Sequence, residues 1–597
     1  MKKINVFVVM AALVLSALLP IAAADEALEP RPMIYGTSSL VVDLDPQFAW
    51  DSASIDHIDQ VCEGLFSYDL TDPSLAIQPQ LAEDFGVWGT KTVDGDVKPT
   101  YTVELKTGVK FHDGSDFDAD DVVFTFDRLE FLCTNESATQ IAELYEPLAS
   151  IHEDTPLLIN ATTKINATYV EFALNYDYVA FIPLLCFAGS VILSDFEGST
   201  PEDDYYVTAT DTLIGTGPYY QESNTDRLTV FKYFEDWYGG DAPDILEMHW
   251  VLYDDATTLN QAFLSGDIDA IGGISMEFMD EYESSEYHDV GDRMQGTVII
   301  YMGFDFNKIE KLTRNAMQAA LNYTYIIEEL GQGELAQMTS IVPKGIMYHD
   351  DTIKAPVQNL TLARELMLEA IATPAVLDTA IPLSQTTGLD AESTDDEWEA
   401  ATVVSYTYTY NSGNAMREGV GELAKANFAK IGIKVTVDGL TWGEFLDSLD
   451  DGSCQIFMLG WGPDYNDPSN FINPLLSPTS TSNHAHVNDS EPIVGLNDLM
   501  SAGLTETNLT EREEIYKEIQ ARVIDQGVWA YLYVSNSRSV YFTGCKNTAR
   551  NAMGKLYFYL WDFDYSEIPK GIPGFSIVAL MGIAAITMSA LIYKKRH

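Results

Sequence analysis

The strongest candidate for chemistry in this sequence is the run GWGPD, residues 460–464. It follows an apolar segment, residues 455–459, that indicates a strand, so the Asp464 carboxylate is expected at a strand end. A desolvated carboxylate in such a place can form a strong, directional pair with an ammonium group. The structural alternative is that Asp464 caps the turn before Asp467-Pro468.

The residues around Asp464 offer further contacts. The backbone of Gly460, Trp461 and Gly462 can pair with an extended chain as an added strand, a contact that tolerates many sequences. Pro463 lacks an N–H group, which limits how far that pairing extends. Trp461 and Trp442 can form aromatic walls of a pocket, or they can pack as core residues between a strand and a helix.

Patterns typical of catalysis or metal binding do not stand out in the sequence. There is no HExxH motif, and no Ser-His-Asp or Cys-His order rises above background. His484-Ala-His486 is interpreted as a solvated pair in a polar loop, and Gly215-Thr-Gly217 lacks the spacing of a phosphate-binding loop. We therefore expect no enzymatic activity, no metal site and no cofactor.

The elements that must position these residues are of mixed α/β type. Residues 245–253, 255–264 and 268–271 read as strand, helix and strand, which is a parallel α/β unit. The later part repeats this pattern around the candidate site, with helices and strands over residues 414–431, 433–437, 442–449, 455–459, 511–526 and 529–534.

Three other segments carry local signals. The alternation in residues 100–114 predicts a hairpin, and Asp118 is expected to cap the helix that follows. The acidic, Thr-rich stretch around residues 386–399 is expected to be a mobile loop. Five cysteines without CxxC spacing permit one or two disulfides but define no pairing.

The composition is that of a globular protein with a strongly acidic surface. Hydrophobic residues make up 46% of the chain, and the formal net charge is −58. A negative field of this size repels phosphates, which excludes a nucleic-acid partner. An evenly acidic surface is typical of a protein kept soluble in a salty exterior, and it can also favour cationic ligands.

The N-terminus has the pattern of an export signal, which we assign to residues 1–24. Lys2 and Lys3 precede an apolar stretch, residues 4–19, and small residues then offer a cleavage site before Asp25. The alternative is an N-terminal helix that is not cleaved. In both cases the body of the chain crosses a membrane.

The C-terminus carries a second apolar segment, residues 572–593, which is long enough to span a bilayer. The basic tail, residues 594–597, is expected on the cytoplasmic side. Pro573-Gly574-Phe575, the apolar stretch and the tail also resemble the sorting signal that archaeal archaeosortases replace with a lipid. Either alternative anchors the protein at the extracellular face of the cell membrane.

Several segments, in the same order, carry a family resemblance. They are EGLF from Glu63, KTGVKFHDGSDFDADDVVFTFDRL from Lys106, IGTGPYY from Ile214, FLSGDIDAI from Phe263, TRNAMQAALNY from Thr313, and GIKVTVDGLTWGEFLDSL with GWGPDYNDPSNFINPLL near the candidate site. From about Ser39 to about Trp561 the chain resembles the extracellular solute-binding proteins of the peptide/nickel type, the oligopeptide- and dipeptide-binding family of ABC importers.

The resemblance implies a two-lobed, periplasmic-binding-protein-like α/β fold with an extra subdomain. Crossover strands would join the lobes, and the ligand would be enclosed between them by hinge closure. Projected onto this chain, the first lobe comprises residues 25–60, 205–300 and 536–567, the accessory subdomain residues 61–204, and the second lobe residues 301–535.

The resemblance also implies roles for the candidate residues. Asp464 matches the aspartate that receives the ligand's α-ammonium group in peptide-binding relatives, and Trp461 and Trp442 match their aromatic pocket walls. One position departs from the pattern, because Met458 stands where some oligopeptide binders have a carboxylate-binding arginine. This weakens the case for a tripeptide and leaves longer peptides, dipeptides held elsewhere and non-peptide ligands open.

The implied function is that of a monomeric binding protein that captures a small peptide for ABC permease subunits. Within the family, an oligosaccharide or a nickel or metal chelate is the alternative cargo. Two alternatives come from other classes. A secreted hydrolase would need a catalytic constellation, and a structural envelope protein would need repeats or a Ser/Thr-rich stalk.

Overall fold

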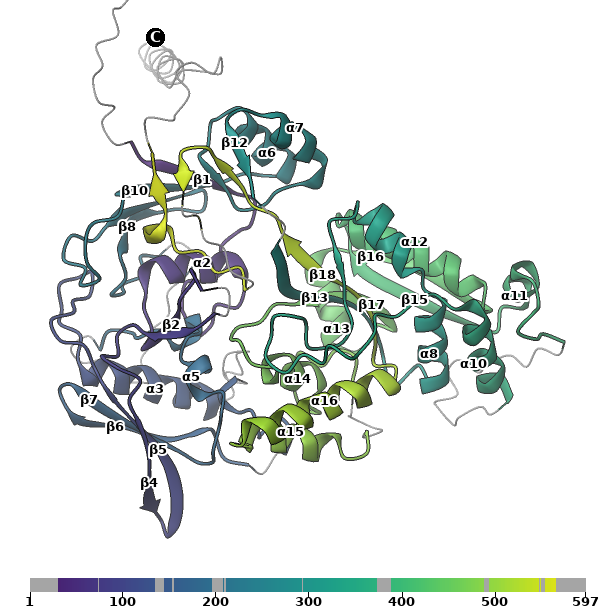
Figure 1. Cartoon of the computed structure of the whole chain (residues 1–597), viewed down its shortest axis with the longest axis horizontal. Coiled ribbons are helices and arrows are strands. Elements are labelled where there is room, and N and C mark those ends of the chain that lie inside the picture. The colour runs from purple at the N-terminus through teal and green to yellow at the C-terminus, as the bar shows by residue number, and fades with distance from the viewer. Residues whose placement is uncertain are drawn as a thin grey trace, which may run out of the picture.

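The computed structural model shows an α/β fold of two lobes with an extra subdomain, which confirms the expected fold class (Figure 1). It describes residues 31–72, 75–134, 144–152, 155–195, 208, 211–291, 294–372, 388–487, 493–546, 548 and 553–564. The expected signal peptide, residues 1–24, and the C-terminal segments, residues 572–593 and 594–597, lie outside the described residues. Within the described ranges, no helix is long and apolar enough to cross a membrane.

The first lobe is built on a sheet of strand order β11-β1-β10-β9-β8. These strands are β1 (Met33–Thr37), β8 (Tyr219–Asn224), β9 (Leu228–Tyr233), β10 (Glu247–Leu252) and β11 (Ala270–Ile271). Strand β1 pairs in parallel with both β10 and β11, and helix α6 (Ala256–Leu264) connects those two strands. The predicted strand–helix–strand unit is confirmed, with β1 inserted between its strands.

The remaining elements of this lobe cover the sheet or lead out of it. They are α2 (Ser52–Val61), η2 (Met276–Phe278), α7 (Met279–Ser284), β12 (His288–Val290), β19 (Val540–Phe542), β20 (Cys545–Lys546), η4 (Phe558–Leu560) and β21 (Asp562–Phe563). Asp51 caps α2, because its side chain accepts a hydrogen bond from the Ser54 N–H group. This cap fixes the end of α2 that faces the second lobe.

The accessory subdomain contains a sheet of order β4-β5-β7-β6 and a helix against it. Its elements are β2 (Phe66–Tyr68), β3 (Ile77–Pro79), β4 (Val87–Val93), β5 (Asp96–Glu104), α3 (Ala119–Thr134), β6 (Ile159–Asn166), β7 (Tyr169–Leu174), α5 (Phe181–Leu184) and η1 (Ala188–Ser190). Asp118 accepts a hydrogen bond from the Asp120 N–H group, as expected for a helix cap.

The prediction that residues 100–114 pair with one another as a hairpin is wrong for the long strand, although the predicted turn at Asp113-Gly114 is present, with an antiparallel bridge between Lys110 and Asp116. Strand β5 instead pairs backward with β4, and the chain reverses at Asp94-Gly95, where both residues have positive φ angles of 52° and 96°. An Asp-Gly pair suits the left-handed conformation that a tight hairpin turn requires. This turn therefore makes β4 one of the two partners of β5, the other being β7, and Gly108 lies in the loop beyond β5.

The second lobe has a sheet of order β14-β18-β13-β17-β15-β16. Its strands are β13 (Met294–Phe304), β14 (Ala336–Gln337), β15 (Val404–Asn411), β16 (Ile433–Leu440), β17 (Ile456–Trp461) and β18 (Trp529–Ser537). Strand β13 follows β12, β18 leads into β19, and β12 pairs with β19 in the first lobe. Strands β13 and β18 therefore carry the chain between the lobes (Figure 1).

Helices cover both faces of this second sheet. They are α8 (Lys311–Ala320), α9 (Tyr323–Tyr325), the π-helix η3 (Ile326–Leu330), α10 (Leu360–Ala372), α11 (Asp395–Ala401), α12 (Ala415–Ala429), α13 (Trp442–Asp450), α14 (Ser469–Leu476), α15 (Leu496–Thr505) and α16 (Leu509–Asp525). The side chains of β17 alternate between the two cores that lie on opposite faces of this sheet. Ile456 and Met458 face one core with α8, α10 and α12, whereas Phe457 and Leu459 face the core shared with the first lobe.

The expectation of a mobile loop over residues 386–399 is wrong for the part that the structure describes. Helix α11 begins there with a capping box, in which Thr394 and Glu397 exchange side-chain-to-backbone hydrogen bonds. Trp398 is fully buried in the second-lobe core. A buried indole and a capped helix outweigh the acidic composition that favoured a loop.

All five cysteines lie among the described residues, and none of them forms a disulfide there. The domain boundaries expected from the family resemblance stay predictions.

Candidate functional site

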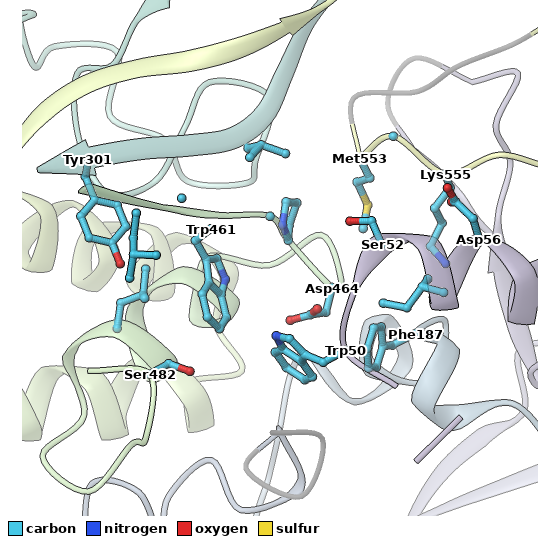
Figure 2. A pocket seen from close by; sticks show the side chains of 18 of the residues that line it. Trp50, Ser52, Asp56, Phe187, Tyr301, Trp461, Asp464, Ser482, Met553 and Lys555 are labelled. Carbon is cyan, nitrogen blue, oxygen red and sulfur yellow. The ribbon is translucent and has the colours of Figure 1, made fainter. Parts of the chain in front are cut away.

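A cavity of about 450 Å³ lies between the lobes, within the usual range of small-molecule sites. The first lobe contributes Trp50 and Lys555, and the accessory subdomain contributes Phe187. Across the cavity lie Tyr301 of β13, Trp461 at the end of β17 and Asp464 just beyond it (Figure 2). Gly460, Gly462 and Pro463 also line this side.

The structure brings all five predicted site residues to this one cavity. Gly460, Trp461, Gly462, Asp464 and Trp442 all line it. Gly460 and Trp461 are the last residues of β17, and Gly462 and Asp464 follow that strand. Trp442 is the first residue of α13, the helix that precedes β17 in the chain. Their roles toward a ligand stay predictions.

Strand β17 has an edge available for pairing near Gly460. On one side, Gly460 and Trp461 pair with Ile300 and Ile299 of β13. On the other side, pairing with β15 ends at Ile456 and Phe457, so no strand among the described residues covers the edge beyond them. Gly460 is needed for the close approach to β13, because a Cβ atom there would lie 2.5 Å from Ile300 Cδ1.

Asp464 is partly buried at the turn after β17 and is tied to Asn470. The Asp464 N–H group donates to Asn470 Oδ1 (2.9 Å), and Asn470 Nδ2 donates to Asp464 Oδ2 (2.7 Å). Burial raises the pKa of Asp464 to about 7, although the Asn470 hydrogen bond and the charge of Lys555 oppose the shift. In Figure 2 the carboxylate points toward the space between Trp461 and Trp50.

A buried ion pair between Arg512 and Asp467 holds the turn that carries Asp464. Arg512 of α16 donates from Nη1 and Nη2 to the two carboxylate oxygens of Asp467, at 2.8 and 2.9 Å. The Arg512 side chain is 0% exposed and that of Asp467 is 2% exposed. Arg512 Nε also donates to the Gly503 carbonyl (2.7 Å), which connects the turn to α15. Arg512 is not recognisable from the sequence alone, since α16 reads as an ordinary charged helix.

Aromatic side chains from three parts of the chain meet at the cavity. The Trp50 ring lies 6.0 Å from the Trp461 ring and 6.0 Å from the Phe187 ring, measured between centroids. The buried Trp461 Nε1 atom has no hydrogen-bond partner among the described residues. Trp442 is 51% exposed at the rim, so the alternative that it is a core residue is wrong.

A buried ion pair that the sequence did not predict forms the first-lobe wall. Lys555 Nζ lies 3.2 Å and 3.5 Å from the carboxylate oxygens of Asp59 in α2, and the two side chains are 8% and 5% exposed. Burial raises the pKa of Asp59, and the charge of Lys555 opposes this shift. The partners are 496 positions apart in the sequence, so no local pattern could have indicated them.

Comparison with known proteins places the chain in a family. The model for bacterial extracellular solute-binding proteins, family 5 (middle region), matches residues 76–483, more than half of the chain. The chain belongs to this solute-binding family.

Individual relatives match over most of their length. The Haemophilus influenzae "Heme-binding protein A" is 25% identical over 76% of this chain and 78% of its own. The Escherichia coli "Dipeptide-binding protein" is 25% identical over 84% of this chain and 88% of its own. The solved Helicobacter pylori periplasmic binding protein DppA, in complex with the peptide STSA, has a TM-score of 0.70 at 20% identity and covers 89% of this chain and 98% of its own. All three of these relatives are binding proteins by name.

For this family-5 solute-binding protein, two further positions bear on the ligand. Met458 is fully buried in the second-lobe core, where the Tyr408 hydroxyl lies 3.5 Å from its sulfur, so the position lies off the cavity. His484 lines the cavity with its side chain 15% exposed, which corrects the expectation of a solvated residue. Burial lowers the pKa of His484 and favours the neutral ring. No group of His, Cys, Asp and Glu side chains within the described ranges could hold a metal ion.

Proposed function

We propose that this chain captures a peptide in the cleft between its lobes and delivers it to the permease subunits of an ABC importer. The observation that carries the proposal is Asp464, a partly buried carboxylate at a strand end, facing a cavity walled by tryptophans. The α-ammonium group of the peptide pairs with this carboxylate, and a charge-assisted contact of that kind is short and directional.

The rest of the site suits an extended peptide. The open edge of β17 after Phe457 presents the backbone of Gly460 and Gly462 for pairing with the peptide main chain. Trp461 and Trp442 cover the side chains, and the Trp461 Nε1–H group donates to a ligand oxygen. Main-chain recognition makes the site tolerant of peptide sequence.

We further propose that the protein acts as a monomer at the extracellular face of the cell membrane. Residues 1–24 direct export, and residues 572–593 anchor the chain, either as a retained span or as a signal exchanged for a lipid. The first lobe is assigned residues 25–60, 205–300 and 536–567, the accessory subdomain residues 61–204, and the second lobe residues 301–535.

A matching peptide is expected to stabilise and compact the protein. A ligand that binds only the folded state adds RT ln(1 + [L]/Kd), about 2.7 kcal/mol at 100 times the Kd. The measurements are thermal unfolding and small-angle scattering of the purified full chain with a panel of free peptides. Peptides blocked at both termini serve as controls. If no free peptide raises the Tm or lowers the radius of gyration, the proposal is wrong.

Peptide affinity is expected to have a maximum between about pH 7 and pH 8. Below pH 7, Asp464 is increasingly protonated because burial raises its pKa to about 7, and affinity should fall roughly tenfold per pH unit. Above about pH 8, the peptide's own α-amine loses its proton. Calorimetric titrations from pH 5 to pH 9 measure the profile. A flat acid limb would contradict a role for an ionised Asp464.

An oligosaccharide is the second candidate cargo. The tryptophans Trp50, Trp442 and Trp461 around the cavity can cover the apolar faces of sugar rings. A sugar needs no ammonium partner, so its affinity would not follow the ionisation of Asp464. Mass spectrometry of molecules released from the purified chain, together with the same Tm screen on sugars and on nickel or haem chelates, separates these cargoes.

A further inference from the structure

The charges that line the cavity are unequal in number. Asp56, Asp59 and Asp464 contribute carboxylates, and His484 is neutral at pH 7 because burial lowers its pKa. Among the described residues that line the cavity, Lys555 is the one lysine or arginine. The site therefore presents one fixed cation, and that cation lies in the lobe opposite Asp464.

Lys555 is held at the wall and is not drawn away from the cavity. Its partner Asp59 belongs to α2, whose capped first turn also faces the cavity. The two contacts to Asp59, at 3.2 and 3.5 Å, are longer than the roughly 2.7–2.9 Å of a tight ammonium–carboxylate bond. This loose geometry permits a second anion to approach the Lys555 ammonium group from the cavity side.

Lys555 and Asp464 act on one another across the cavity. The positive charge of Lys555 lowers the pKa of Asp464, against the larger effect of burial. Two charges of opposite sign thus face one space of about 450 Å³ from two lobes. A ligand with an ammonium group at one end and a carboxylate at the other complements both charges. Binding Asp464 with one end and Lys555 with the other would favour the closed arrangement of the two lobes.

We propose that Lys555 receives the ligand's carboxylate, so that the cleft selects short peptides with both termini free. This inference rests on the proposed peptide function and deepens it. It assigns to the first lobe the carboxylate contact that Met458, buried in the second-lobe core, cannot make. Long peptides are disfavoured because both charged walls belong to one small cavity.

The test is calorimetry on the purified full chain, with di- and tripeptides that have either a free or an amidated C-terminus. The natural protein is expected to bind the free acids at least about tenfold more tightly, since amidation removes one side of a desolvated charge pair. Lys555→Gln should lose the same factor for the free acids and nothing further for the amides, because both changes remove one interaction. Lys555→Arg should keep most of the preference.

Two further variants keep the test decisive. Lys546→Gln removes an exposed lysine from the same C-terminal segment and should leave binding unchanged. If Lys555→Gln alone fails to fold because Asp59 is left buried and unpaired, the double variant Asp59→Asn/Lys555→Gln removes the pair together and should show no preference for the free acid.

The outcomes distinguish the two proposals. If free and amidated peptides bind the natural protein equally well, Lys555 only fastens the C-terminal segment to α2, while the peptide function stands. If no free-terminus peptide binds at all, the peptide function itself is wrong and the carboxylate assignment fails with it.

Discussion

Replacing Arg512 with methionine is expected to lower the free energy of unfolding by about 3–5 kcal/mol, because Asp467 would remain as a buried, uncompensated carboxylate. Methionine keeps much of the volume of the side chain, so the loss comes from the two hydrogen bonds to Asp467, the one to Gly503 and the longer one to the Tyr516 hydroxyl. Denaturant unfolding followed by circular dichroism measures the change.

The matched control for Arg512→Met is Lys517→Met on the same helix, α16. Lys517 pairs with Glu513 and Glu514 at the surface, where ion pairs contribute little, so this variant should unfold almost like the natural protein. The double variant Arg512→Met/Asp467→Leu removes both charges and should recover part of the loss. If the Arg512 and Lys517 variants have the same free energy of unfolding, the buried Arg512–Asp467 pair does not contribute to stability as expected.

The Arg512 variant should also weaken ligand binding under conditions where it is still folded. Asp467 lies three residues beyond Asp464, and its carboxylate accepts hydrogen bonds from the Ser469 N–H and hydroxyl groups as well as from Arg512. Loss of the arginine frees this turn and broadens the position of the Asp464 carboxylate. The ion pair is thus the link between the packing of α16 and the geometry of the site.

The parts of the fold that the sequence predicted well are those with a strong local period. The unit β10-α6-β11 and the strand β17 follow directly from runs of apolar residues bounded by turns. The errors arose where a local turn or helix-capping signal determined the structure against the alternation or composition of the longer stretch around it. The Asp94-Gly95 turn pairs β5 with β4, and the Thr394 capping box begins a helix in a stretch whose composition favours a loop.

The second-lobe wall of the candidate site could be predicted for a similar reason. Residues 460–464 are consecutive, and the end of a strand is a place that local patterns locate. The opposite wall could not be predicted, because Trp50, Asp59 and Lys555 are brought together only when distant segments fold onto one another. No period or motif in the sequence records a contact between α2 and the chain near residue 555.

The peptide hypothesis meets its most direct test at Asp464. Asp464→Asn keeps the shape of the side chain and can still bond with Asn470, but it removes the charge that would face an α-ammonium group. Loss of one side of a buried, hydrogen-bonded charge pair costs about 2–5 kcal/mol, or roughly 30-fold or more in affinity. Asp438→Asn, an exposed change in the same lobe, is the matched control and should bind normally.

N-acetylated peptides supply the other half of this experiment, since they lack the same charge on the ligand. They should bind poorly to the natural protein, and the Asp464→Asn variant should not distinguish them from free peptides. The two defects should not add, because each removes the same contact. Calorimetry on the four combinations of protein and peptide measures that coupling. If acetylated and free peptides bind the natural protein equally well, Asp464 is only a cap of its turn, and a sugar bound by Trp50, Trp442 and Trp461 becomes the better account of the cavity.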